Sequence, residues 1–155
     1  GALISQSAVE RMEKIVADAV SKGAKVLCGG KRPEGKRGFY FLPTILTDVT
    51  PDMRAVNEEI FGPIMSIIPY ETEEEAIAGA NDTQYGLASY VWSTDYCEVA
   101  RIVKGLQFGV VNVNGPGTGP NYPHGGWKDS GIGADGSCYS LDEYFCKKGV
   151  RVALR

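Results

Sequence analysis

The middle of the chain alternates between two kinds of hydrophobic pattern, and this alternation restricts the possible folds more than any other feature. Short apolar runs occupy 64–70, 87–92 and 109–114, and apolar residues recur at helical spacing in 72–80 and 95–104 between them. Strands and helices that alternate with short links are typical of a parallel sheet wrapped by helices. The sequence therefore predicts an α/β fold, a parallel twisted sheet flanked by helices.

The first residues predict a helix and a strand that precede this alternation. Apolar residues recur every three or four positions through 7–22, as expected for an amphipathic helix. Ser7 and Glu10 match a capping box at its start, and Gly23 stands where a glycine commonly ends a helix. A short strand is predicted at 25–28.

Regular patterns end after Asn114. Residues 115–136 contain eight glycines and three prolines among 22 residues, too many for a helix or a strand. A loop of this length in a compact domain is usually functional or disordered, and its aromatic residues and histidine argue against disorder. A short helix near 137–145 and a final strand at 149–154 are predicted to complete a single domain that no linker divides.

Composition and charge exclude several classes of partner. The net charge of -3 and the pI near 5.2 provide no basic surface for nucleic acid or for an anionic membrane. No apolar run approaches the roughly 20 residues that cross a bilayer, and the first residues do not resemble a secretion signal. We therefore expect no nucleic-acid partner, no membrane partner and a cytoplasmic location. The four cysteines form no C-x-x-C pair, so no metal site is predicted.

Two motifs in the long loop are weighed and rejected. "GIGADG" at 131–136 matches the dinucleotide pattern G-x-G-x-x-G, but hydrophilic residues precede it where that pattern requires a strand. Asp129, Ser130 and His124 offer the side chains of a hydrolase triad. Lys128 and Ile132, however, stand where the glycines of G-x-S-x-G should be.

Two further features each leave two interpretations open. His124, the only histidine, is either an exposed loop residue or a ligand contact that the glycines after it make accessible. Glu58 and Glu59 precede the strand at 64–70, and the simpler interpretation is a solvated turn. A carboxylate followed two residues later by an aromatic ring, here Phe61, would also suit a ribose and its base.

Several motifs together closely resemble the aldehyde dehydrogenase superfamily. "NEEIFGP" is similar to that family's E-E-x-F-G-P, "YGLASYVWS" to its Y-G-L-(A/S)-x-x-(V/I)-(W/F) strand, and "GGWKDSGIG" to its G-G-x-K-x-S-G-x-G loop. The likeness follows the family order over essentially all 155 residues. It implies oxidation of an aldehyde to a carboxylate with NAD or NADP, through a cysteine thiohemiacetal, hydride transfer and a thioester.

The resemblance also implies roles for individual residues. Glu59 corresponds to the glutamate that binds the nicotinamide ribose hydroxyls, Phe61 to the phenylalanine that contacts the nicotinamide, and Glu58 has no role beyond holding the turn. "HGGWKDSGIGADG" resembles lactaldehyde and glycolaldehyde dehydrogenases most, and a histidine at this position also resembles some aminobutyraldehyde dehydrogenases. The resemblance thus implies that His124 contacts a small hydroxy- or amino-aldehyde substrate.

The chain departs from the family pattern in one respect. The family's nucleophile lies in a G-Q-x-C segment, and none of the four cysteines does. The chain thus resembles the C-terminal third of a longer enzyme: 1–145 would belong to the catalytic domain and 146–155 to the oligomerisation strand, without the dinucleotide-binding domain. We expect it to be inactive alone, without catalytic residues, and to form a homodimer or homotetramer as part of the full-length enzyme. The alternative is a naturally short, non-catalytic binding or assembly module.

Overall fold

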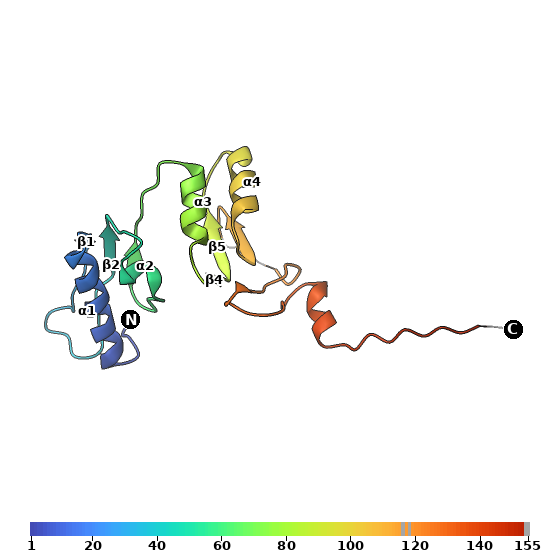
Figure 1. The fold of residues 1–155 in the computed structure, drawn as a ribbon. Coiled ribbons are helices and arrows are strands. Elements are labelled where there is room, and N and C mark those ends of the chain that lie inside the picture. The colour runs from blue at the N-terminus through green and yellow to red at the C-terminus, as the bar shows by residue number, and fades with distance from the viewer. Residues whose placement is uncertain (116, 118, 154–155) are drawn as a thin grey trace. The chain divides into compact units, whose positions relative to one another are not determined.

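The computed structural model describes residues 1–115, 117 and 119–153 (Figure 1). The chain divides into two compact units, Gly1–Tyr70 and Glu71–Arg155. Each unit is described by itself below, and the predicted domain organisation remains a prediction. Among the described residues, no helix is long and apolar enough to span a membrane.

The first unit is a three-stranded sheet with two helices. Its elements in chain order are α1 (Gln6–Ser21), β1 (Lys25–Cys28), β2 (Thr44–Thr47), α2 (Arg54–Asn57) and β3 (Ile64–Ser66). β2 lies in the centre, antiparallel to β1 and parallel to β3. The parallel pair is joined through α2, whereas the connection from β1 to β2 contains no helix, and a chain that returns without a crossover pairs antiparallel.

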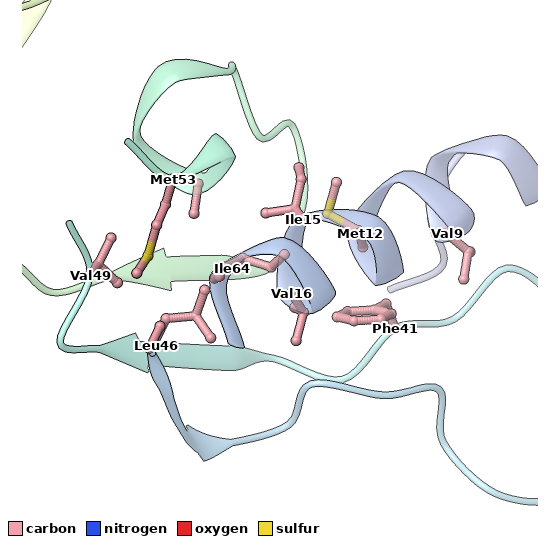
Figure 2. Close-up of a cluster of buried hydrophobic side chains, with 12 residues drawn as sticks. Val9, Met12, Ile15, Val16, Phe41, Leu46, Val49, Met53 and Ile64 are labelled. Atoms are coloured by element: carbon pink, nitrogen blue, oxygen red, sulfur yellow. The ribbon is translucent and has the colours of Figure 1, made fainter. Parts of the chain in front are cut away.

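The core of this unit lies between one face of α1 and the sheet (Figure 2). The apolar stripe predicted from helical spacing is the buried face of α1, and it packs with side chains from β2, β3 and the segment before α2. The fully buried side chains of this core include Val9, Met12, Ile15, Leu46 and Met53. Burial of this stripe stabilises a helix that would be only marginally stable alone.

The start of α1 differs from the prediction by two residues. Ser5, in extended backbone, is the N-cap, and its Oγ accepts a hydrogen bond from Ala8 N at 3.1 Å. Ser7 lies inside the first turn, and Glu10 accepts from Gln6 rather than completing a capping box. The error arose because two serines with the same capping chemistry stand two positions apart. The glycine end of the helix is confirmed, since Gly23 has a φ of 104°.

The second unit contains two helices, two short sheets and a 3-10 helix. Its elements are α3 (Glu73–Asn81), β4 (Tyr85–Gly86), β5 (Ala88–Val91), α4 (Tyr96–Gly105), β6 (Val110–Val113), β7 (Trp127–Lys128) and η1 (Cys138–Glu143). β5 and β6 are parallel, as predicted for strands joined by a helix, and β4 pairs antiparallel with β7. The short helix predicted near 137–145 is confirmed as η1.

The α/β class is confirmed, but the single parallel sheet is not. The described strands form three small sheets, in which parallel and antiparallel pairs both occur. The strand in the apolar run at 64–70 is β3, which is only three residues long, and Met65, Ile67 and Ile68 of this run are exposed. The final strand is not confirmed either. Residues 149–153 belong to no strand, and 154–155 lie outside the described residues.

The core of the first unit yields a matched pair of stability variants on neighbouring strands. Leu46→Ala removes a fully buried side chain, which should lower the free energy of unfolding of this unit by about 2–5 kcal/mol. Leu27→Ala makes the same change on β1, where the side chain is 63% exposed, and should cost less than about 0.5 kcal/mol. Amide hydrogen exchange of α1 measures both effects. Equal losses of protection would contradict this description of the core.

Candidate functional site

The turn between α2 and β3, residues 58–63, is held to the first unit by its even-numbered positions. The Glu58 carboxylate accepts two hydrogen bonds from the Arg54 guanidinium, at 2.6 and 2.9 Å. Ile60 packs against the core. Gly62 lies against Met12 of α1 so closely that an added Cβ would overlap the sulfur. The turn therefore has little freedom to move relative to α1.

Backbone hydrogen bonds fix the same turn at two further points. Arg11 of α1 donates from its guanidinium to the carbonyl oxygen of Glu59 at 2.7 Å. Thr44 N, at the start of β2, donates to the Pro63 carbonyl at 2.8 Å. Both ends of the Glu59–Pro63 segment are thus tied to regular structure, and the backbone that carries its side chains is preorganised.

Glu59 and Phe61 lie on this anchored backbone with their side chains exposed. No described residue forms a hydrogen bond or ion pair with the Glu59 carboxylate. Phe61 is 77% exposed, and its φ of 40° is unusual for an aromatic residue. Strained backbone that presents an apolar ring to solvent does not serve the core, and such strain is concentrated at ligand sites. A free carboxylate and a flat ring two positions apart suit a hydroxyl-bearing ligand with an aromatic ring.

Glu58 has a different environment from its neighbour. The two hydrogen bonds from Arg54 hold the pKa of the Glu58 carboxyl below its usual value, and the positive charge of Arg54 adds to this effect. Both oxygens of this carboxylate are thus already paired with a side chain of α2, in the bidentate geometry that arginine forms with carboxylates. The geometry thus supports a structural role for Glu58.

In the second unit, the segment "WKDSG", residues 127–131, is attached by hydrogen bonds to β4 and the residues just before it. Ser130 Oγ accepts from Gly86 N at 2.9 Å, and Asp129 N donates to the Gln84 carbonyl at 3.0 Å. The Lys128 ammonium donates to two backbone carbonyls, those of Asn81 and Thr83. β7, which the sequence analysis missed, is part of this attachment. These residues anchor the loop.

The hydrolase triad is not formed in the structure. Ser130 Oγ bonds to backbone, and the His124 ring bonds to Asp135 rather than to Ser130 or Asp129. "GIGADG" is likewise no anion cradle. The Glu143 carboxylate accepts from Ala134 N at 2.8 Å, so a side chain of η1 occupies this loop. Both rejections made from the sequence are consistent with this geometry.

His124 lies at the edge of an open hollow of about 710 Å³ in the second unit. Its ring Nδ1 lies 2.8 Å from Asp135 Oδ1, and the two residues also exchange backbone hydrogen bonds. β6 and the residues that follow it form the rest of the lining. The described lining residues are 109–115, 117, 119 and 122–124, and they include no lysine and no arginine. The hollow therefore suits a polar, uncharged group better than an anion.

Three of the residues that shape these features were missed by sequence reasoning. Gly62 and Asp135 stood inside motifs of the sequence analysis but were given no role, because their importance comes from contacts with residues 50 and 11 positions away. Arg11 was read only as part of the helix. The four cysteines are free and exposed, and no potential metal-binding cluster occurs among the described residues.

Comparison with known proteins gives a consistent result. The family model "Aldehyde dehydrogenase family" matches residues 1–150. Mitochondrial succinate-semialdehyde dehydrogenase of Homo sapiens is 49% identical over 97% of this chain, and the NADP(+) succinate-semialdehyde dehydrogenase GabD of Escherichia coli (strain K12) is 42% identical over 99%. The chain spans 28% and 32% of the length of these two relatives.

Solved structures agree with the sequence comparisons. A Mycobacterium tuberculosis aldehyde dehydrogenase complexed with NAD+ matches 93% of this chain with a TM-score of 0.85 and 43% identity. Lactaldehyde dehydrogenase of Escherichia coli matches 93% with a TM-score of 0.84 and 42% identity. The chain covers 30% of each of these structures.

The environment of Glu58 leads to a pH-dependent prediction. Arg54→Gln should raise the pKa of the Glu58 carboxyl toward its usual value, as measured by NMR titration. Because the pKa is depressed in the folded state, the stabilisation by the ion pair is present above the unfolded pKa and is lost as the pH falls through the folded pKa. The wild type and Arg54→Gln should therefore converge in stability in acid.

Lys31→Gln is the matched control for this titration, because it removes one exposed cation of the same unit that pairs with Glu34 instead. Lys31→Gln should leave the pKa of the Glu58 carboxyl unchanged. A pKa of Glu58 that does not move in Arg54→Gln would show that the bidentate pair does not form.

Proposed function

The chain belongs to the aldehyde dehydrogenase family, and we propose that it contributes the nicotinamide-contacting turn and the substrate loop of an enzyme that oxidises a small aldehyde to its carboxylate. The observation that carries this proposal is the anchored turn at 58–63, which leaves the Glu59 carboxylate and the Phe61 ring free. The family uses NAD or NADP, and the relatives include an NAD+ complex and an NADP-dependent enzyme.

In this proposal the chain supplies binding groups and no nucleophile. Glu59 would accept hydrogen bonds from the nicotinamide ribose hydroxyls, and Phe61 would contact the nicotinamide. A cysteine outside these 155 residues adds to the aldehyde to give a thiohemiacetal. Bound NAD or NADP would accept the hydride that the aldehyde carbon loses, and water would then release the carboxylate from the thioester. On this basis the isolated chain does not turn over aldehyde.

The proposed substrate is a small polar aldehyde, of the lactaldehyde or glycolaldehyde type or an amino-aldehyde. His124 lines a hollow whose described lining residues carry no full positive charge, which favours a hydroxyl or amine over a carboxylate. The human and GabD relatives are both named for succinate semialdehyde, which carries a carboxylate, whereas one solved structure is a lactaldehyde dehydrogenase. Comparing aldehydes that carry a carboxylate with aldehydes that carry a hydroxyl therefore tests this proposal directly.

Oligomerisation and location complete the proposal. Residues 146–153 are exposed and pair with no strand of the described chain, so their backbone is free to add to a sheet of a second subunit in a homodimer or homotetramer. Residues 1–145 would then be the part that belongs to the catalytic domain. The cytoplasmic location remains a prediction, and the human relative is named as mitochondrial.

The competing hypothesis is a short, non-catalytic binding or assembly module that keeps this fold. The two hypotheses differ in whether the reading frame upstream of Gly1 continues into a G-Q-x-C segment. A stop codon and a ribosome-binding site immediately upstream would favour the module.

The role of Glu59 is tested in the complete enzyme with Glu59→Gln. A neutral amide accepts from ribose hydroxyls less strongly than a carboxylate, so the KM for NAD or NADP should rise about tenfold or more. Glu74→Gln, an exposed carboxylate on α3 with no partner among the described residues, is the control and should leave this KM unchanged. Unchanged steady-state constants in Glu59→Gln would remove the ribose assignment.

The role of His124 is tested by ranking substrates. His124→Phe should reduce kcat/KM for lactaldehyde and glycolaldehyde about tenfold relative to unsubstituted aldehydes, because it removes the ring nitrogens while keeping an aromatic ring. Aminobutyraldehyde and succinate semialdehyde complete the panel. Tyr144→Phe, which alters an exposed aromatic residue that does not line the hollow, serves as the control. If His124→Phe left the ranking of the substrates by kcat/KM unchanged, His124 would be an ordinary exposed loop residue without a role in substrate binding.

A further inference from the structure

His124 and Asp135 are joined by three hydrogen bonds. His124 N donates to the Asp135 carbonyl and Asp135 N donates to the His124 carbonyl, each at 2.8 Å, and the side chains meet at 2.8 Å between Nδ1 and Oδ1. In an antiparallel pair of this kind, side chains directly opposite each other lie on the same face. The carboxylate is therefore set beside the imidazole by the backbone as well as by its own contact.

The contact decides which ring nitrogen carries the hydrogen. An ionised carboxylate is an acceptor only, so Nδ1 must be the donor. A neutral imidazole that donates through Nδ1 carries its free lone pair on Nε2. Nε2 has no hydrogen-bond partner among the described residues and is available to accept from a ligand.

Asp135 is itself held in place. Its neighbour Ala134 donates from its backbone N to the Glu143 carboxylate, and a Cβ on Gly133 would collide with the same carboxylate. On the other side, a Cβ on Gly136 would collide with the carbonyl oxygen of Tyr122. The carboxylate is thus presented to His124 from a closely packed segment and not from a free loop.

The other polar side chains of the hollow are already engaged. The Asn112 amide donates to Ser89 O and accepts from Gly117 N, and the Asn114 amide bonds to both backbone groups of Ser93. Among the described lining residues, His124 and the Tyr122 hydroxyl are the polar side chains left for a ligand.

We propose that Asp135 is a positioning residue that holds His124 with Nδ1 protonated, so that Nε2 accepts a hydrogen bond from the hydroxyl of a hydroxy-aldehyde substrate. This inference rests on the proposed function and adds a specificity-determining residue to it. Asp135 does not touch the substrate, and its effect passes entirely through the orientation and tautomer of the imidazole.

The kinetic test compares glycolaldehyde with acetaldehyde, which has the same carbon chain without the hydroxyl. In the complete enzyme, Asp135→Ala should lower the ratio of their kcat/KM values about tenfold, the effect of one lost hydrogen bond. Asp135→Asn keeps a neutral acceptor and should lose less. Asp129→Ala, in the same loop, should leave the ratio unchanged. Because Asp135 acts through His124, Asp135→Ala should have no further effect in a His124→Phe enzyme.

A spectroscopic test examines the imidazole directly. Solid-state 15N NMR of histidine-labelled complete enzyme, with the His124 signals assigned by their loss in His124→Phe, should show Nδ1 protonated and Nε2 bare. Asp135→Ala should convert His124 to a mixture of tautomers, whereas Asp129→Ala should not. These shifts report the ring itself, and a general loss of stability would not reproduce them.

These measurements distinguish a failure of the role of Asp135 from a failure of the proposed function. A bare Nδ1 in the wild type, or an unchanged glycolaldehyde to acetaldehyde ratio in Asp135→Ala, would overturn the role of Asp135 while leaving aldehyde oxidation intact. An Asp135→Ala effect of equal size in the His124→Phe background would also overturn it. If no aldehyde reduces NAD or NADP, the proposed function fails, and the tautomer measurement still decides whether Asp135 positions His124.

Discussion

The contact between Gly62 and Met12 is the constraint on which the candidate cofactor turn depends. Met12 is a fully buried side chain of α1, and the turn can lie against it only because position 62 has no Cβ. The helix is in turn tied to α2, since Arg54 N donates to the Asp18 carboxylate at 2.9 Å. The apolar stripe of α1 therefore has two functions. It forms the core of the first unit, and it fixes the backbone from which Glu59 and Phe61 project.

The second unit uses the same principle with different groups. The long glycine-rich loop has no apolar face to bury, so hydrogen bonds hold it instead: Lys128 and Ser130 bond to the β4 region, and Glu143 bonds to the loop amide of Ala134. These polar anchors are worth about 1 kcal/mol each, less than a buried side chain, but they are directional. They fix the backbone near His124 without filling the hollow that a substrate would need.

Local patterns predicted the elements well, and long-range contacts account for most of the errors. Helical spacing located α1, α3 and α4 within one or two residues, and the α4 crossover correctly predicted that β5 and β6 are parallel. β7 was missed because two residues paired with a distant strand leave no periodicity. The antiparallel pairing of β1 was missed because alternation elsewhere in the chain suggested crossovers throughout. The final strand at 149–154 remains without a partner among the described residues.

For the candidate site, residue types alone were not sufficient to assign different roles to Glu58 and Glu59. The alternation between side chains that contact the protein and side chains that are exposed explains why. In "EEIFGP" the two carboxylates are chemically the same, and the sequence offered both a solvated turn and a ligand site. The structure shows a period of two: Glu58, Ile60 and Gly62 contact the protein, while Glu59 and Phe61 are exposed. The backbone here is not that of a regular strand, since Phe61 has a φ of 40°, and contacts with α1, α2 and the core determine which positions are held. Three positions of the motif therefore hold the turn, and the other two keep exposed side chains. The apolar Ile60, two positions after Glu58 and one after Glu59, is the signal that could have separated the two carboxylates.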